Sequence, residues 1–524
     1  MAPKFLRADE AVRLVKDEDI VVLEGAGGGL LEADALLKAL GARYRETGAP
    51  RNLTLVHISG IGDNKEGGVG HLALPGLARR VIAGHWGMAP LMQKLAADEQ
   101  VEAFNLPQGV LSQLMREIAG GRLGLITHVG LNTFVDPRVD GGKMNQRAKD
   151  AGEDIVELIE IRGQKQLFYP AFAPNVAFIK GSTADENGNI SFEQEPAYLE
   201  ALSVAQATRN KGGTVIVQVR RVAQANRLDP RLVKIPGPLV DVVVVEPEQW
   251  QTVDRQFNPG LCGEIRVPVD GILPLELNER KIIARRAAME VSPGLLNVGM
   301  GMPDGVANVA AEEGFYDQIT FCIEQGLYGG VPAGGVIFGT TYNPAAIIDA
   351  PYQFDFFDGG GLDVSCLGMG QVDRTGNVNV SKMGEKIVGT GGFVNISQNA
   401  KKMIFCGTFT GGGLKLAVGN GELKIVQEGR YQKFVKQVDQ ITFSGEYAVF
   451  SGQKVLYVTE RAVFGITAAG LELREIAPGI DLQRDILNQL PFKPLISPNL
   501  QIMAASIFTD EPMGLKSSLG RKGT

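Results

Sequence analysis

Two hydrophobic patterns alternate along the chain: short continuous apolar runs, and longer stretches with helical spacing between them. Apolar runs of this length predict buried strands, and apolar positions three and four apart predict helices. The predicted strands are 19–23, 53–58, 80–83, 123–127, 176–179, 214–219 and 240–245. The predicted helices between them are 8–17, 32–40, 111–119 and 196–209. This alternation predicts an α/β fold with a mostly parallel sheet.

The second half of the chain repeats patterns of the first. An apolar run, a glycine turn and a helix follow one another at 21–40 and again from residue 295. The turn sequence DENGNI at 185–190 has a counterpart, DRTGNV, at 373–378. We therefore expect two related open-sheet α/β halves, residues 1–258 and 277–524, facing each other across a cleft. Residues 259–276 are irregular and contain prolines, which indicates a linker, and Asn278 is placed to cap the helix that follows.

One stretch of the second half carries the strongest chemical signal. An apolar run, 319–323, leads directly to Glu324, and Gly326 follows two residues later. Ligands of α/β proteins bind where strands end, so a lone carboxylate at this place is a candidate nucleophile. The alternative is a solvated glutamate that caps the following turn.

Composition narrows the class of protein. The chain has 524 residues, 44% of them hydrophobic, and a net charge of −7, which argues against a nucleic-acid partner. We find no secretory signal and no uncharged run of membrane-spanning length, so we expect a cytoplasmic protein without a membrane partner. Four cysteines without CxxC spacing suggest free thiols in a reducing compartment. The four histidines lie in the first third without metal-ligand spacing, so we expect no metal site.

A set of motifs in fixed order resembles the family I coenzyme A (CoA) transferases, and most closely their fused propionate/acetate CoA-transferases. The likeness covers essentially the whole chain. The motifs are EAFNLPQGVL (102–111), GLNTFVDP (130–137), IEQGLYGG (323–330), FDGGGLDV (357–364), QVDRTGNVNVS (371–381), VGTGGFVNI (388–396) and YVTERAVF (457–464). The resemblance implies a CoA-transferase / sugar-isomerase-like fold.

The resemblance also implies roles for particular residues. Glu324 would be the covalent nucleophile, and the backbone N–H of Gly392 would bind an oxyanion. Gln108 would supply a second oxyanion donor or acyl contact, or would only cap the helix that follows it. CoA would be both substrate and covalent intermediate, with no permanently bound cofactor and no metal. The residues expected to contact substrate or CoA are Gly326, Tyr328, Lys382, Gly389, Gly391 and Phe393.

The role of Lys382 and the effect of the residues after Glu324 stay open. Lys382 either meets a CoA phosphate or is a solvated lysine. Gln325, Leu327 and Tyr328 stand where the family usually has small residues and proline, which leaves the acyl specificity open. Glu460 and Arg461 are expected to form a structural ion pair.

The expected activity is transfer of CoA from a short-chain acyl-CoA to a carboxylic acid such as acetate or propionate. It would follow a ping-pong course through an acyl-glutamyl anhydride and a glutamyl-CoA thioester, in a homodimer or homotetramer. An acyl-CoA hydrolase of the same fold and a non-enzymatic metabolite sensor are the alternatives. The sequence leaves open which acid is physiological and in which direction the reaction runs.

Overall fold

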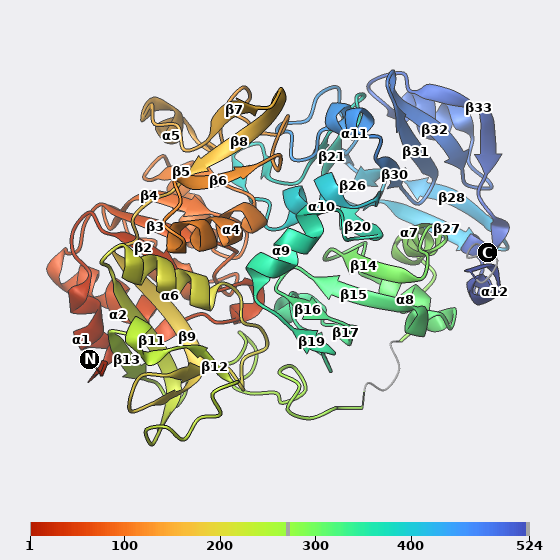
Figure 1. The fold of residues 1–524 in the computed structure, drawn as a ribbon. Helices are drawn as coiled ribbons and strands as arrows, with labels where there is room; N and C mark the ends of the chain where they lie inside the picture. The colour runs from red at the N-terminus through yellow and green to blue at the C-terminus, as the bar shows by residue number, and fades with distance from the viewer. Residues whose placement is uncertain (1, 269–272, 520–524) are drawn as a thin grey trace. The chain divides into compact units, whose positions relative to one another are not determined.

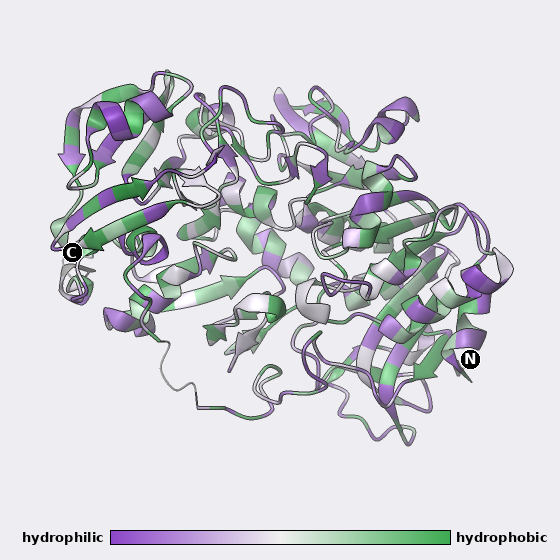
Figure 2. Ribbon diagram, turned by 180° about the vertical axis from the view of Figure 1, so that it is seen from behind, coloured by the Kyte–Doolittle hydropathy of each residue, from purple (hydrophilic) through white to green (hydrophobic). Residues whose placement is uncertain are grey.

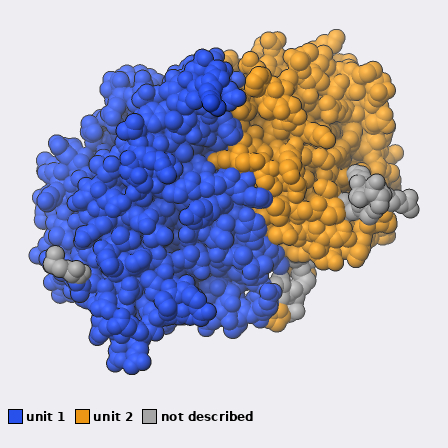
Figure 3. Space-filling view, in the orientation of Figure 1, with its two compact units in different colours: residues 1–267, 323–356, 384–395 blue, residues 268–322, 357–383, 396–524 orange. Residues whose placement is uncertain are grey.

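The computed structural model describes residues 2–268 and 273–519, and Figure 1 shows its helices and strands. The chain forms two compact units, coloured separately in Figure 3. The first contains residues 1–267, 323–356 and 384–395, and the second contains residues 268–322, 357–383 and 396–524. The segment with Glu324 therefore belongs to the first unit, although it follows the predicted linker. Residues 269–272 of that predicted linker lie outside the described residues.

A parallel sheet forms the centre of the first unit. Across the sheet its strands are β1 (Lys4–Leu6), β13 (Val242–Val245), β11 (Thr214–Ala223), β9 (Val176–Asp185), β2 (Ile20–Leu23), β3 (Leu53–His57), β4 (Ala78–Ala83) and β5 (Glu102–Asn105). Neighbours along this path pair in parallel. Strands β3, β5 and β9 are buried along their whole length, which is typical of parallel strands covered on both faces. The predicted α/β class is confirmed.

Helices connect these strands and carry one apolar face each. They are α1 (Ala8–Ala11), α2 (Asp34–Thr47), α3 (Pro90–Ala97), α4 (Gln108–Ala119) and α6 (Ala201–Asn210). Figure 2 shows hydrophobic residues concentrated in the sheet strands, whereas the helices alternate between hydrophobic and hydrophilic residues. The helix predicted at 32–40 starts at Asp34 and continues to Gly48, whose left-handed backbone (φ 67°) ends it.

One predicted strand joins a different sheet. The run at 123–127 forms β6 (Gly124–Thr127), which pairs antiparallel with β8 (Gln164–Pro170). Strand β7 (Glu157–Ile161) completes this small sheet. The residues of β6 are half-buried or exposed, and Leu123 before it is 86% exposed. A sheet with one face toward water is typical of antiparallel pairing, so an apolar run alone did not reveal its partner.

The second unit contains a mixed sheet. Across it the strands are β15 (Ile319–Ile323), β14 (Gly294–Val298), β20 (Val364–Gly368), β25 (Lys402–Cys406), β30 (Lys454–Val458), β31 (Ala462–Thr467), β32 (Gly470–Ile476) and β33 (Leu495–Ile502). From β15 to β30 the pairs are parallel, whereas β31 is antiparallel to both of its neighbours. The accompanying helices are α7 (Glu279–Ala288), α8 (Gly305–Glu312), α11 (Gly445–Ser451) and α12 (Leu515–Leu519).

The two similar turn sequences, at 185–190 and 373–378, have the same hydrogen-bond pattern. The carboxylate of Asp185 accepts from the backbone and side chain of Asn189, and Asp373 accepts from Asn377 in the same way. The side-chain oxygens of these asparagines each accept one further backbone N–H, from Gly237 and Gly445 respectively. Each turn introduces an antiparallel pair, β9 with β10 (Ile190–Ser191) and β21 (Gln371–Val372) with β22 (Val378–Asn379). This match supports the inferred relation between the halves.

Helix α7 starts as its sequence predicts, but three of its four basic residues, Lys281, Arg285 and Arg286, are buried. The side chain of Asn278 accepts the N–H groups of Arg280 and Lys281, so the expected cap is confirmed. Arg285 is fully buried and pairs with Glu312 at 3.1 Å, and Lys281 shares the same carboxylate. These charges stabilise the packing of α7 within the second unit.

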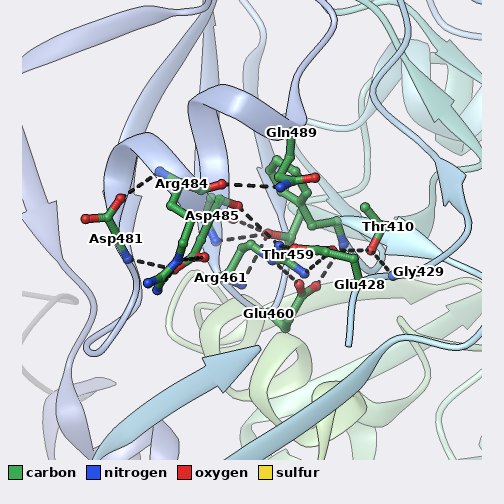
Figure 4. A network of polar contacts seen from close by, with 12 residues as sticks. Thr410, Glu428, Gly429, Thr459, Glu460, Arg461, Asp481, Arg484, Asp485 and Gln489 are labelled. Carbon is green, nitrogen blue, oxygen red and sulfur yellow. Dashed lines mark hydrogen bonds and ion pairs between the residues drawn. The ribbon is translucent and has the colours of Figure 1, made fainter. Parts of the chain in front are cut away.

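The predicted ion pair between Glu460 and Arg461 is also confirmed. Both side chains are fully buried, and Arg461 Nε lies 2.6 Å from Glu460 Oε1 (Figure 4). The guanidinium also donates to both carboxylate oxygens of Glu428 and to the carbonyl of Asp485. The second oxygen of Glu460 accepts the backbone N–H of Phe409. Buried charges need such complete pairing, because desolvation otherwise costs several kcal/mol.

Candidate active site

Glu324 sits in a tight turn at the end of β15. The N–H of Gly326 donates to the carbonyl of Ile323 at 3.0 Å, which closes a four-residue turn around Glu324 and Gln325. Gly326 has φ 93°, and a Cβ atom there would lie 2.0 Å from the carbonyl oxygen of Ile348. Only glycine fits this position, and the turn holds the half-buried carboxylate of Glu324 at the strand end.

The chain after this turn forms a short hairpin. Strand β16 (Leu327–Tyr328) pairs antiparallel with β19 (Ala346–Ile347), and the N–H of Ile348 donates to the carbonyl of Gly326 at 2.8 Å. Leu327 is fully buried, whereas Tyr328 is half-buried. The ring of Tyr328 lies 6.5 Å from that of Phe356, on helix α9 (Ala350–Asp358). Of the two bulky residues, only Tyr328 keeps part of its side chain accessible.

The glycine turn at 389–392 docks on the ends of β4 and β5. The N–H of Gly391 donates to the carbonyl of Gly84 at 2.8 Å, and Asn105 at the end of β5 accepts the N–H of Thr390. Gly389 (φ 82°) and Gly391 (φ 52°) adopt left-handed backbones, which glycine favours. Among the described residues, no acceptor binds the N–H of Gly392, and Phe393 begins helix α10 (Phe393–Asn399).

Gln108 is joined to this turn. It is the first residue of α4, and its backbone N–H donates to the carbonyl of Gly391 at 2.9 Å. Its side chain is 1% exposed, and its Oε1 accepts the hydroxyl of Ser59 at 3.3 Å. Its Nε2 donates to no group in the described part of the chain. The side chain therefore does not cap α4, and a buried amide donor remains beside the glycine turn.

Helix α9 links this turn to the segment with Glu324. Phe354 of α9 packs against Gly109, the residue that follows Gln108. A Cβ atom at Gly109 would lie 2.4 Å from the Phe354 ring. About two turns further along α4, Arg116 forms an ion pair with Asp355 of α9. The structure thus brings Gln108 and Gly389–Phe393 together, and places Glu324, Gly326 and Tyr328 in the same unit. Lys382, in β23 (Lys382–Met383), belongs to the second unit.

Two histidines, the buried His57 and the half-buried His85, lie near the glycine turn. Burial lowers the pKa of His57 to about 4, and burial together with His57 lowers the pKa of His85 to about 4. His57 Nδ1 lies 2.6 Å from the carbonyl oxygen of Ser59. This contact helps to position Ser59, whose hydroxyl donates to Gln108. His85 Nδ1 accepts the N–H of Gly87, so its proton is on Nε2. Both rings are neutral at pH 7 and shape the site without adding charge.

Buried carboxyl groups flank the first glycine turn, and sequence reasoning missed them. Burial raises the pKa of Glu32 from 4.5 to about 8 and that of Glu200 to about 7. The pKa of Glu24 is also raised well above its usual value, by burial and by the nearby charge of Glu200. The glycines between Glu24 and Glu32 pack closely: a Cβ at Gly28 would lie 3.0 Å from Ile337 Cα. Isolated acidic residues inside the apolar stretch VVLEGAGGGLLEADALL were the available signal.

No three metal-binding side chains in residues 2–268 and 273–519 are arranged to hold a metal ion. None of the helices in those ranges has the length and hydropathy to cross a membrane.

Comparison with known proteins places this geometry in context. Residues 5–246 match the family model described as Coenzyme A transferase. The chain is 46% identical to the acetate CoA-transferase YdiF of Escherichia coli K12, over 97% of this chain and 96% of that one. It is 47% identical to the caffeate CoA-transferase of Acetobacterium woodii, over 99% and 100% of the two chains. The crystal structure of the YdiF apoenzyme from E. coli O157:H7 superposes with a TM-score of 0.93, at 45% identity, covering 98% of this chain and 97% of that one.

The raised pKa of Glu32 predicts a pH-dependent stability. Between pH 4.5 and about 8 the folded protein keeps a proton that the unfolded chain loses. The free energy of unfolding should therefore fall as pH rises through this window, by ~1.4 kcal/mol per pH unit for this group. Below pH 4.5 and above about pH 8 Glu32 should add no slope. Glu32→Gln keeps the oxygen that accepts the N–H of Gly62, so it should be more stable than wild type at pH 8.

Urea titrations at a series of pH values measure this effect. Glu46→Gln, which alters an exposed residue of α2, is the control and should follow the wild-type profile. Equal slopes for wild type and Glu32→Gln would contradict the assigned burial of a protonated Glu32.

Proposed function

The chain belongs to the coenzyme A transferase family and is an enzyme of that class, and on this premise we propose that it moves CoA from a short-chain acyl-CoA to a small carboxylic acid such as acetate or propionate. The names of the two relatives, acetate and caffeate CoA-transferase, support a carboxylic acid as acceptor. The observation that carries the mechanism is the carboxylate of Glu324, held in a glycine turn at a strand end. Membership of an enzyme family argues against a metabolite sensor.

Glu324 acts as the nucleophile in this proposal. A carboxylate with an ordinary pKa of ~4.3 is ionised at neutral pH and needs no base. It attacks the thioester carbonyl of acyl-CoA, giving an acyl-glutamyl anhydride and CoA thiolate. The thiolate then attacks the glutamyl carbonyl, which releases the first acid and leaves a glutamyl-CoA thioester. A second acid reverses both steps. A solved YdiF structure described as a thioester complex with CoA supports a thioester intermediate.

Two donors suit the oxyanion formed on the acyl carbon. They are the backbone N–H of Gly392 and the Nε2 of Gln108, which bind no other group in the described residues. A preorganised donor of this kind is worth roughly 3–4 kcal/mol in the transition state. Ser59 fixes the Gln108 amide with its donor end available. The hydrogen bond from Gly391 to Gly84 positions the other donor, the backbone N–H of Gly392.

The remaining assignments follow from the resemblance. Gly326, Tyr328, Gly389, Gly391 and Phe393 contact the acyl group or CoA in this proposal. Lys382 contacts CoA, and CoA is substrate and covalent intermediate but not a resident cofactor. A homodimer or homotetramer in the cytoplasm, with no metal, remains a prediction from the sequence.

The covalent step can be tested directly. Incubation with acyl-CoA alone should place CoA on the peptide 321–330, as measured by mass spectrometry after digestion. Glu324→Gln should lose the adduct and lower kcat by at least ~10⁴-fold, the scale of loss when a nucleophile is removed. Glu385→Gln, at an exposed glutamate, is the control. A CoA adduct on a cysteine, or a fully active Glu324→Gln, would refute the assignment.

Tyr328 is predicted to limit the length of the acyl chain. Its half-buried ring follows Glu324 by four residues, and one methylene in a fitted pocket is worth about 1–3 kcal/mol. Tyr328→Ala should raise kcat/KM for hexanoyl-CoA relative to acetyl-CoA by more than tenfold. Tyr352→Ala, at a more exposed tyrosine of α9, should leave this ratio unchanged. A parallel loss of activity on all chain lengths together with a lower Tm would mean that Tyr328 only packs.

A further inference from the structure

The side chain of Gln325 is buried beside the proposed nucleophile. It is 4% exposed, and its Nε2 lies 3.5 Å from Glu324 Oε1, in a long hydrogen bond. Its own Oε1 is buried and has no partner among the described residues. Burying an amide with incomplete hydrogen bonding costs about 1–3 kcal/mol, so this arrangement needs a reason beyond stability. The contact with Glu324 supplies one.

The backbone around Gln325 fixes this amide in place. The turn from Ile323 to Gly326 sets where its side chain leaves the chain. Gly339 packs against the amide: a Cβ there would lie 3.3 Å from both the Cδ and the Nε2 of Gln325. Gly339 has φ 98°. Ile337, in the same loop, packs closely against Gly28. The amide is therefore held between the carboxylate of Glu324 and a wall of backbone.

The proposed reaction creates two oxyanions on two different carbons. The first forms on the substrate's acyl carbon. The second forms on Cδ of Glu324, when the CoA thiolate attacks the anhydride: a C–S bond forms and the carbonyl electron pair moves onto the oxygen that Glu324 retains. The oxyanion's electron pair then re-forms the Cδ carbonyl, and the bond from Cδ to the bridging oxygen breaks. The first acid leaves as a carboxylate. No proton is transferred, so this second oxyanion needs a hydrogen-bond donor that remains in place.

We propose that the side-chain amide of Gln325 is the donor for the oxyanion on Glu324, separate from the donors that serve the acyl carbon. This proposal rests on the function proposed above. Because Nε2 binds Glu324 Oε1, that oxygen is the one retained, and the other oxygen attacks the substrate. A long hydrogen bond in the resting enzyme is expected to shorten as charge develops. Gln325 is therefore a catalytic residue, and it acts on the formation and breakdown of the glutamyl-CoA thioester.

The test separates the two steps by labelling. Acyl-CoA with one label in the acyl group and another in CoA is mixed with excess enzyme and quenched early. The acyl label on the protein reports anhydride, and the CoA label reports thioester. Gln325→Met, which has similar volume and no donor, should lower kcat by ~10²–10³-fold, the cost of losing one oxyanion donor. It should accumulate the acyl label at the expense of the CoA label. Gln108→Ala is the matched comparison. It should slow the appearance of the acyl label and of the CoA label on the protein to the same extent.

Gln325→Glu gives a second readout that does not depend on the stability of the methionine variant. Its carboxyl can donate only when protonated, so its rate relative to wild type should rise as pH falls. Unchanged kcat in both variants, an equal loss of both labels in Gln325→Met, or a flat relative pH profile for Gln325→Glu would overturn the role of Gln325. Wild-type enzyme that forms no CoA adduct on Glu324 would instead overturn the proposed function.

Discussion

The proposed active site depends on one steric constraint, the absence of a side chain at Gly326. The backbone of Ile348 lies so close that a Cβ atom would overlap its carbonyl oxygen. This contact lets the chain reverse immediately after β15 and leaves Glu324 at the strand end, with Gln325 turned inward beside it. The same contact starts the hairpin that leads into α9, which packs against α4. Gln108 is the first residue of α4. A carboxylate on a flexible loop would lose the positioning on which nucleophilic catalysis depends.

Some ionisable groups of the first unit are uncharged near neutral pH. Burial keeps Glu32 and Glu200 protonated toward neutral pH and keeps His57 and His85 uncharged. Other buried charges are paired, as in Arg80–Glu102 of the first unit and around Arg461 in the second.

Local features were predictable from the sequence and distant partners were not. The strands, the cap at Asn278 and the pair Glu460–Arg461 depend on residues close together in the chain. The contact of Gly391 with Gly84 and the support of Gln108 by Ser59 join segments that no local pattern connects. Glycine content indicated tight turns, but only the structure shows which backbone each glycine approaches. The sequence marks Gln325 as unusual, but only the structure shows that its side chain contacts Glu324.

The central claim is that the carboxylate of Glu324 exchanges oxygen with the substrate acids, and an oxygen label tests it most directly. The enzyme is converted to its CoA-bound form with unlabelled acyl-CoA and then given acceptor acid labelled with ¹⁸O in its carboxylate. The acid attacks the thioester, and the returning thiolate attacks the acyl carbon, so one labelled oxygen must stay on Glu324. The account predicts one ¹⁸O in the peptide 321–330 after a single turnover. Formation of labelled acyl-CoA with no ¹⁸O on Glu324 would contradict it.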